Sequence, residues 1–242
     1  MRVSAATDCG RVRSQNQDAY CYEQLPGGAF LAVVCDGMGG ARAGEIASRT
    51  ATREIRDYVL RSYSQQMNPS GIEAMLKAAV ESANTAVYND SRQEETHRGM
   101  GTTVVLALIQ SSQGFLLHAG DSRAYLYRDP SLLCLTRDHS MVQHLLDTGK
   151  ITRDEAAQHP QRNIITRALG VAPTLNAEAD FFELRGQERL LLCTDGLFNM
   201  LSAQEMAEEL SVADEQTAQR LIERANAAGG TDNITAVIVS NE

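Results

Sequence analysis

The sequence predicts an α+β fold in which antiparallel sheets pack together and are covered by helices. Three observations support this prediction: a helical hairpin in the first third, closely spaced short strands after it, and further strand-like segments toward both ends. Connections this short indicate antiparallel neighbours, because a parallel crossover needs more chain. No repeat, low-complexity tract or linker divides the sequence, so we expect residues 1–242 to form a single domain.

The first half of the chain contains a buried strand followed by two helices. The apolar run 30–35 has the length and composition of a strand that is covered on both faces. Apolar residues then recur with helical period over 43–59 and again over 72–87. The polar stretch 64–71, which contains Pro69 and Gly71, separates them and predicts a helical hairpin.

The second half begins with short strands and ends with alternating strands and helices. Turn residues separate β-type runs, which are 102–109, 115–119, 124–128 and 132–136. A polar stretch from 138 to about 170 has helical signals but little deeply apolar content, so we expect it on the surface. The remaining expected elements are a strand at 189–193, helices at 203–210 and 215–228, and a last strand at 234–239.

Composition and charge narrow the functional classes. The formal net charge of the 242 residues is −9, with no run of five or more basic residues, so nucleic acid and anionic membranes are poor partners. The first residues lack the apolar stretch of a secretory signal, and no apolar run is long enough to span a membrane. Five scattered cysteines without a C-x-x-C motif suit reduced thiols. We therefore expect a cytoplasmic protein.

Five aspartates lie at expected strand ends or in tight turns, and they are Asp18, Asp36, Asp121, Asp195 and Asp232. Two of them, Asp36 and Asp195, come just after apolar runs and are followed by glycine. Each position, taken singly, is also explained by an ordinary turn, because Asp-Gly and Gly-Asp are common turn dipeptides.

Taken together, the five aspartates predict a site for divalent cations if the strands lie side by side. Several like charges within a few ångströms would repel one another and be poorly solvated, and cations would neutralise them. Oxygen ligands without histidine at metal-binding spacing favour Mg²⁺ or Mn²⁺ over zinc. Gly37, which follows Asp36, lets its own carbonyl approach an ion.

Arg13 is a candidate for binding phosphate beside such ions, because a guanidinium offers two parallel donors to phosphate oxygens. A solvated surface arginine is the alternative, and the residues alone leave both open. Other phosphate chemistries lack their motifs: no cysteine has arginine six residues later, no Asp-x-Asp occurs, and the glycine-rich segment 37–44 has no Gly-Lys-Ser/Thr ending.

Eight short motifs run in order through nearly the whole chain, at 10–13 with 16–18, 34–40 with 44–48, 100–103, 118–123, 135–140, 162–170, 194–196 and 230–235. In this combination the sequence resembles the bacterial branch of the metal-dependent serine/threonine protein phosphatases, the phosphatase 2C-like or PPM family. The resemblance implies a β-sandwich of two antiparallel sheets flanked by helices (α-β-β-α), with a metal cluster at one end.

The resemblance also implies roles for the residues of a binuclear centre. Asp36 would bridge two Mn²⁺ or Mg²⁺ ions, and Gly37 would ligate one of them through its carbonyl. Asp195 and Asp232 would complete the centre. Arg13, Asp36 and Asp195 are the residues expected to act in catalysis.

Outside this centre, the resemblance assigns three further features. Asp18 would hold a metal-bound water, and Asp121 together with Asp195 would hold a third, weaker ion. Arg13 would bind the substrate phosphate. Residues from about 146 to 174 would form a flap beside the active site.

The expected function is therefore hydrolysis of phosphoserine and phosphothreonine on proteins by metal-activated water. The family implies partners, namely a serine/threonine protein kinase and the proteins that it phosphorylates, and we expect a monomer. One position departs from the family pattern: Ala41 stands where a histidine, a proposed general acid, is common. This departure motivates an alternative, a catalytically silent phosphoprotein-binding regulatory domain on the same fold. A nucleotide-binding switch would need a phosphate loop that is missing.

Overall fold

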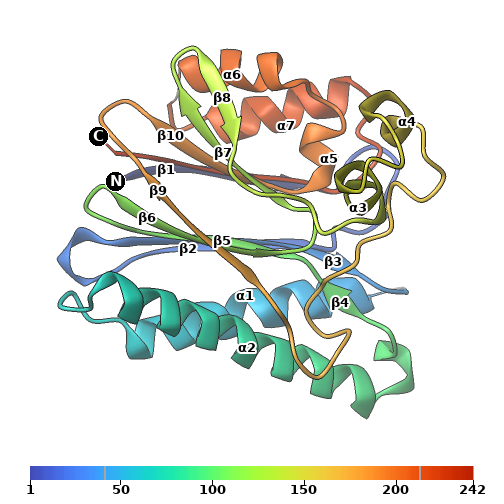
Figure 1. The fold of residues 1–242 in the computed structure, drawn as a ribbon, viewed down its shortest axis with the longest axis horizontal. Helices are drawn as coiled ribbons and strands as arrows, with labels where there is room; N and C mark the ends of the chain where they lie inside the picture. Colours follow the sequence, from blue (N-terminus) through green and yellow to red (C-terminus); the bar gives the residue numbers. More distant parts are fainter. Residues whose placement is uncertain (41, 213, 242) are drawn as a thin grey trace.

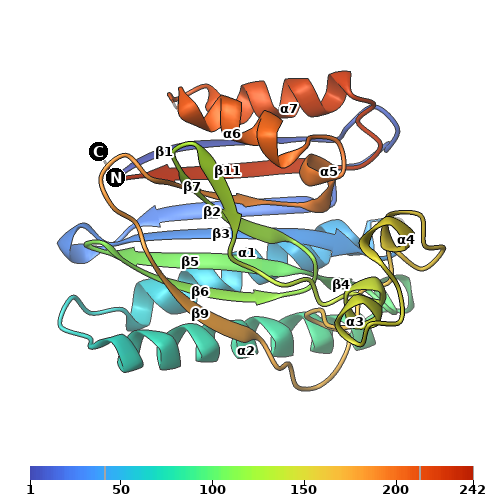
Figure 2. The same cartoon turned by 45° about the horizontal axis from the view of Figure 1, so that its top comes forward.

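The computed structural model describes residues 1–40, 42–212 and 214–241, and it confirms the predicted α+β fold. Two antiparallel sheets pack face to face, and helices cover the outer face of each sheet (Figure 1). The two chain ends lie close together at one end of the sandwich (Figure 2).

The first sheet joins the beginning and the end of the chain. Its strands follow the order β1-β11-β10-β7-β8, with β1 at Arg2–Asp8, β11 at Ile234–Ser240, β10 at Arg189–Cys193, β7 at Arg123–Arg128 and β8 at Ser131–Cys134. β1 pairs with β11 over its whole length, from Arg2↔Ser240 to Asp8↔Ile234.

The second sheet has the order β2-β3-β5-β6-β9, and a short strand, β4, pairs with the end of β3. Their bounds are Asp18–Gln24 for β2, Phe30–Met38 for β3, Gly101–Thr102 for β4, Val104–Gln110 for β5, Gln113–Ala119 for β6 and Glu178–Glu183 for β9. Short 3₁₀ turns lie at Pro26–Gly28 (η1) and Glu95–His97 (η2).

The helices fall into three groups. α1 (Ala43–Ser62) and α2 (Pro69–Gln93) form the predicted hairpin and cover the second sheet. The first sheet is covered by α5 (Asp195–Phe198), α6 (Ala203–Ser211) and α7 (Thr217–Ala227). Two short helices, α3 (Met141–Asp147) and α4 (Arg153–Ala157), lie at one end of the sandwich.

The strand β3 explains why the run 30–35 is apolar throughout. Its side chains alternate between two separate cores, so every residue of the run is buried. Leu31, Val33 and Cys35 pack in the core beneath α1 and α2, whereas Phe30, Ala32 and Val34 pack between the two sheets.

Local sequence sets the start of α2. The Asn68 side-chain oxygen accepts a hydrogen bond from the Gly71 backbone N–H at 2.8 Å, and Pro69 occupies the first helical turn. An asparagine cap followed by proline is a favoured helix start, because proline has no N–H to leave unsatisfied.

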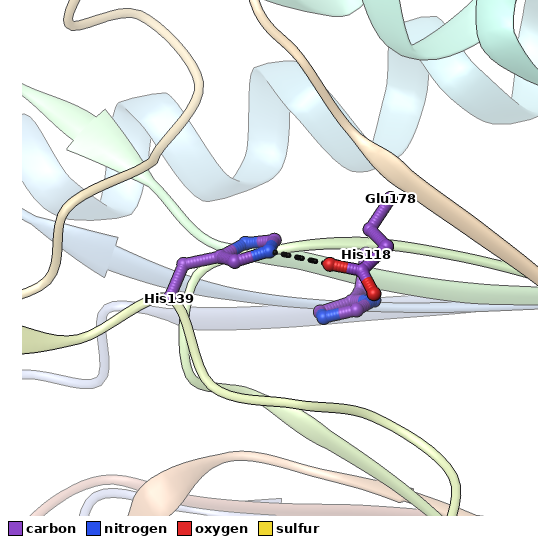
Figure 3. Close-up of side chains that lie close together, drawn as sticks. All are labelled: His118, His139 and Glu178. Atoms are coloured by element: carbon purple, nitrogen blue, oxygen red, sulfur yellow. Dashed lines mark hydrogen bonds and ion pairs between the residues drawn. The ribbon is translucent and has the colours of Figure 1, made fainter. Parts of the chain in front are cut away.

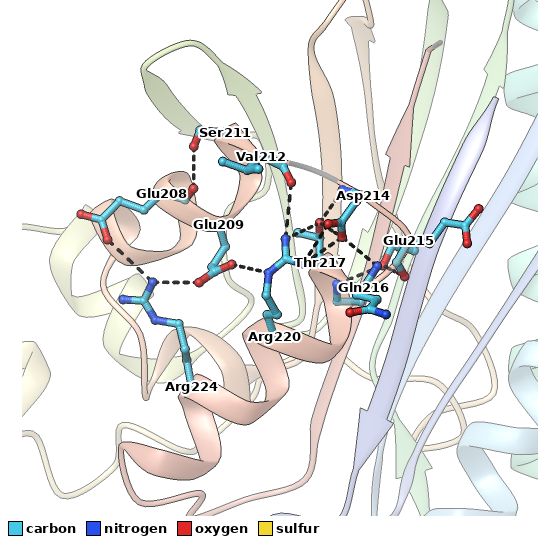
Figure 4. A network of polar contacts seen from close by, with 12 residues as sticks. Glu208, Glu209, Ser211, Val212, Asp214, Glu215, Gln216, Thr217, Arg220 and Arg224 are labelled. Atoms are coloured by element: carbon cyan, nitrogen blue, oxygen red, sulfur yellow. Dashed lines mark hydrogen bonds and ion pairs between the residues drawn. The ribbon is translucent and has the colours of Figure 1, made fainter.

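α6 and α7 are held together by charged side chains (Figure 4). Arg220 Nε donates to Glu209 Oε2 at 2.9 Å, and Arg224 Nη1 donates to Glu209 Oε1 at 3.1 Å. Glu209 therefore receives one arginine on each oxygen. This network keeps the two helices side by side over the first sheet.

The strand β9 has no counterpart among the elements predicted from sequence. It forms one edge of the second sheet by pairing with β6, and the Phe182 ring lies over Gly114, where a Cβ atom would approach that ring to 2.2 Å. Phe181 is 53% exposed, and its backbone N–H donates to Asp180 Oδ1 at 2.7 Å.

Residues 135–177 leave the sheets between β8 and β9 and contain α3 and α4, as the polar composition of this stretch predicts. The outgoing and returning chains meet where Ser140 bridges to Ile165. The predicted flap, residues 146–174, lies within this excursion. Across the described ranges, no helix has both the length and the apolar character needed to cross a bilayer.

The core beneath α1 and α2 generates a test of stability. Leu76 is fully buried on α2, whereas Leu60 on α1 is 44% exposed. We expect Leu76→Ala to lower the free energy of unfolding by about 2–5 kcal/mol, because it removes buried contacts and leaves a cavity. Leu60→Ala, the matched control, should cost less than about 1 kcal/mol. Urea unfolding measures both, and equal losses would contradict the described core.

Candidate metal centre

Two neighbouring strands of the second sheet place Asp18 and Asp36 opposite each other. Asp18 is the first residue of β2, Asp36 lies near the end of β3, and their Cα atoms are register partners. Residues directly opposite in an antiparallel pair have Cα atoms about 4.5–5.5 Å apart. The two carboxylates therefore share one end of the sandwich, the end at which α3 and α4 lie in Figure 1.

The prediction that Asp36-Gly37 follows a strand is wrong, because β3 continues to Met38 and Gly37 pairs with Thr102 of β4. A Cβ atom at Gly37 would lie 2.0 Å from the Gly44 carbonyl oxygen. Close packing against the start of α1, rather than a turn, explains this glycine.

The first sheet contributes Asp195 and Asp232 to the same end. Asp195 opens α5 after β10, and Asp232 lies just before β11. Two threonine hydroxyls, one just after β10 and one in β11, reach Asp18 across the sandwich: Thr194 Oγ1 donates to Asp18 Oδ2 at 2.8 Å, and Thr235 Oγ1 donates to the same oxygen at 2.7 Å. The two sheets therefore meet at the Asp18 carboxylate.

Asp121 lies in the turn between β6 and β7, as predicted. Thr103 ties this turn to Asp36: its hydroxyl accepts from the Asp36 N–H at 2.9 Å and contacts Ser122 Oγ at 2.7 Å. Gly120 has a positive φ of 114°, and a Cβ there would approach Thr103 Cγ2 to 2.6 Å. Thr103 was not predicted as a functional residue, although it belongs to the motif at 100–103.

Arg13 lies at the edge of this cluster. Its Nη2 donates to Asp232 Oδ2 at 2.8 Å, and its side chain is 56% exposed. The loop that carries it is held by Asn233, whose side-chain nitrogen donates to the carbonyls of Cys9 and Gln15, both at 2.9 Å. Asn233 is a positioning residue that the sequence signalled only through the neighbouring Asp232.

Burial and mutual repulsion raise the pKa values of four carboxyls in the cluster. Burial is the largest cause in each case, and it raises the pKa of Asp18 to about 7 despite two hydroxyl bonds that lower it. The pKa of Asp195 rises to about 7 and that of Asp121 to about 6. Burial and the charge of Asp18 raise the pKa of Asp36 well above its usual range.

Two buried carboxylate oxygens give a second reason to expect divalent cations in the cluster. Asp18 Oδ1 and Asp195 Oδ1 are buried, and neither has a hydrogen-bond partner among the residues that the structure describes. Buried polar atoms normally have partners. Carboxylate oxygens without donors, in a site where charge is poorly solvated, suit Mg²⁺ or Mn²⁺.

Ala41 lies outside the described residues, so the structure gives no account of that position. His118 and His139 are buried and lie beside Glu178, with ligand atoms of the three within 4.8 Å of one another. The sequence had no signal for this grouping, because the three residues come from separate segments.

Comparisons with known proteins agree on one family. The profile of "Protein phosphatase 2C" matches residues 7–232. The serine/threonine phosphatase Stp of Listeria monocytogenes is 37% identical over 244 residues, which cover 100% of this chain and 96% of that protein. The solved S. agalactiae serine/threonine phosphatase is 35% identical, with a TM-score of 0.93 and coverage of 100% and 99%. The catalytic domain of the phosphatase PstP, solved with two manganese ions, is 35% identical, with a TM-score of 0.84 and coverage of 98% and 96%.

The raised pKa of Asp18 predicts a pH dependence for the protein in a chelator. An aspartate with a folded pKa near 7 binds its proton more tightly than the unfolded chain does, with its pKa of about 3.9. Stability should therefore fall as pH rises from about 4 to 7. Asp18→Asn removes this charge, so the variant should unfold at a higher temperature than wild type at pH 7.5 but not at pH 4.

Thermal unfolding by circular dichroism at both pH values measures the difference. Asp57→Asn, at a position on α1 that is 38% exposed, is the matched control and should follow wild type. Parallel wild-type and Asp18→Asn profiles would show that Asp18 has an ordinary pKa.

Proposed function

This chain belongs to the protein phosphatase 2C family, and from that premise we propose that it hydrolyses phosphoserine and phosphothreonine on proteins with the aspartate cluster as its metal centre. The observation that carries the assignment is the convergence of buried carboxylates from both sheets, two of whose oxygens lack donors among the described residues. Bound cations would offset the repulsion between these carboxylates, so the cluster suits a metal centre.

We assign the two core ions to four residues. Asp36 would bridge them, a role supported by the charges of Asp18 from its own sheet and of Asp195 and Asp232 from the other, which all act on its carboxyl. Asp195 and Asp232 would complete the centre from the first sheet, and the Gly37 carbonyl would add one ligand. Two ions held in this way would acidify a water for in-line attack on phosphorus and neutralise the phosphoryl oxygens.

The remaining residues have supporting roles in the proposal. Asp18, fixed by two threonine hydroxyls, would orient water at the centre. Asp121 would hold a third, weaker ion together with Asp195, whose pKa responds to the charge of Asp121. Mn²⁺ and Mg²⁺ both suit these oxygen ligands.

Arg13 would bind the phosphate of the substrate. One nitrogen of its guanidinium is engaged by Asp232, and the 56% exposed side chain leaves the rest of the fork open to solvent. A planar fork can donate two parallel hydrogen bonds to a phosphate, which fixes the orientation of the ester.

The expected partners follow from this chemistry. Phosphorylated proteins are the substrates, and we propose that a cognate serine/threonine kinase supplies them. The net charge of −9 disfavours nucleic acid and anionic membranes. A monomer in the cytoplasm completes the proposal.

The central experiment measures Mn²⁺-dependent release of phosphate from a phosphothreonine peptide. Chelator should abolish turnover, and Asp195→Asn should lower it on the order of 100-fold or more, because it strips charge from the metal centre. Asp57→Asn on α1 is the control and should match wild type. Activity of Asp195→Asn within a few-fold of wild type at saturating Mn²⁺ would overturn the metal assignment.

The same assay, together with a binding measurement, tests the alternative function. A catalytically silent domain, the alternative suggested by Ala41, would bind the phosphopeptide in a fluorescence titration but release no phosphate at any Mn²⁺ concentration. Turnover by wild type would exclude this alternative.

Arg13→Lys tests the phosphate-binding role. We expect the Michaelis constant for the phosphopeptide to rise by about tenfold with a smaller fall in kcat, because a point charge cannot replace the fork. Arg11→Lys, in the same loop, is the matched control. If the Michaelis constant of Arg13→Lys is unchanged, Arg13 is a surface residue.

A further inference from the structure

The turn that carries Asp121 is hydrogen-bonded to His139, which lies shortly before the predicted flap in the chain. The Gly120 N–H donates to His139 Nδ1 at 3.2 Å, and the His139 N–H donates to the Gly120 carbonyl at 2.9 Å. These bonds connect His139, through its side chain and its backbone, to the residue directly before Asp121.

The other side of the turn is held by Asp138. Arg123 Nε and Nη2 donate to the two carboxylate oxygens of Asp138 at 2.8 and 2.7 Å. The Arg123 guanidinium carbon also lies 3.7 Å from the ring centroid of Phe198, the last residue of α5. One guanidinium therefore joins the Asp121 turn, Asp138 and the helix that begins with Asp195.

Asp138 and His139 also lie where the excursion that contains the flap segment, residues 146–174, leaves the sheets. The Thr166 N–H donates to the His139 carbonyl at 2.7 Å, and the Met141 N–H donates to the Ile164 carbonyl at 2.8 Å. The outgoing chain at 139–141 is thereby paired with the returning chain at 164–166, and these two paired segments form the neck of the excursion. A shift of this neck moves the same residues that hold Asp121.

The group formed by His118, His139 and Glu178 serves this positioning better than it would serve an ion (Figure 3). His139 Nδ1 accepts a hydrogen bond from the Gly120 N–H, so the neutral ring carries its proton on Nε2, which donates to Glu178 Oε2 at 3.1 Å. Arg167 Nη1 lies 3.1 Å from the same Nε2. The His118 and His139 rings are stacked at 4.7 Å and are within 6° of parallel. Imidazole lone pairs lie in the ring plane, so two stacked rings do not direct them at one ion.

We propose that Asp138 and His139 are positioning residues that hold Asp121 for the third, weaker ion, called the outer ion below, and that they couple binding of this ion to the order of the flap segment. The inference rests on the proposed function, because it takes Asp121 as a ligand of that ion. Coupling of this kind is reciprocal: an ion that fixes Asp121 orders the neck, and an ordered neck favours the ion.

Two substitutions at His139 separate its contacts. In His139→Asn the side-chain oxygen takes the place of Nδ1, so the Gly120 bond is kept and the Glu178 bond is lost. In His139→Gln the side-chain amide takes the place of Nε2, so the Glu178 bond is kept and the Gly120 bond is lost. The pair therefore tests the specific bond to the Asp121 turn against general packing.

The experiment titrates Mn²⁺ into the chelator-treated full chain by calorimetry and follows amide hydrogen exchange of residues 164–169 by mass spectrometry, with and without saturating Mn²⁺. In wild type, Mn²⁺ should slow exchange in this segment. His139→Gln should keep the two tight ions but bind the outer ion about 10–100-fold less tightly. It should also lose most of the Mn²⁺-dependent protection of residues 164–169 from exchange. His139→Asn should bind the outer ion with an affinity within about threefold of that of wild type.

Three results would overturn the proposal: equal weakening of the outer ion by both variants, wild-type binding of that ion by His139→Gln, or exchange at 164–169 that does not respond to Mn²⁺ in wild type. A wild-type protein that binds no tight ions would instead overturn the proposed metal centre, and this inference with it. The two failures are thus distinguishable without an activity assay.

Discussion

The contact between the two sheets at Asp18 is the constraint on which the rest of the site depends. Asp18 belongs to the second sheet, yet its carboxylate accepts hydroxyl bonds from Thr235 of the first and from Thr194, just after β10. These bonds fix the separation of the sheet ends. Asp36 and Asp195, which come from different sheets, are consequently close enough for the charge of one to raise the pKa of the other. The arrangement is electrostatically unfavourable without cations, and it persists because the buried cores on both sides determine where the strands end.

The same constraint explains why residues with a supporting role surround the carboxylates of the site. Thr103 links the backbone of Asp36 to the Asp121 turn, and Asn233 holds the loop of Arg13 through two carbonyls. Gly37 and Gly196 allow backbone segments to approach each other more closely than any Cβ would permit. A set of mutually repelling carboxylates needs such support, because each would otherwise move toward solvent.

Much of the fold and of the site could be predicted from sequence because the aspartates and Arg13 lie in short motifs beside strands with a clear apolar pattern. Features that depend on distant packing could not. β9 reads Glu-Ala-Asp-Phe-Phe-Glu, which does not alternate, and it becomes a strand because Gly114 leaves room for the Phe182 ring. The position of Asp36-Gly37 inside β3 depends on pairing with β4, more than sixty residues later. The role of His139 depends on Gly120 and Thr166, which no local pattern connects.

The edge strand β9 has a consequence for how molecules of this protein meet. An open strand edge presents backbone donors to which a strand of another molecule can add. Here the Asp180 carboxylate already takes the Phe181 N–H, and Glu178 and Glu183 add negative charge along the same short strand. Two copies aligned edge to edge would bring these carboxylates together and repel. Edge-to-edge pairing at β9 is therefore disfavoured, although Phe181 on this strand is exposed.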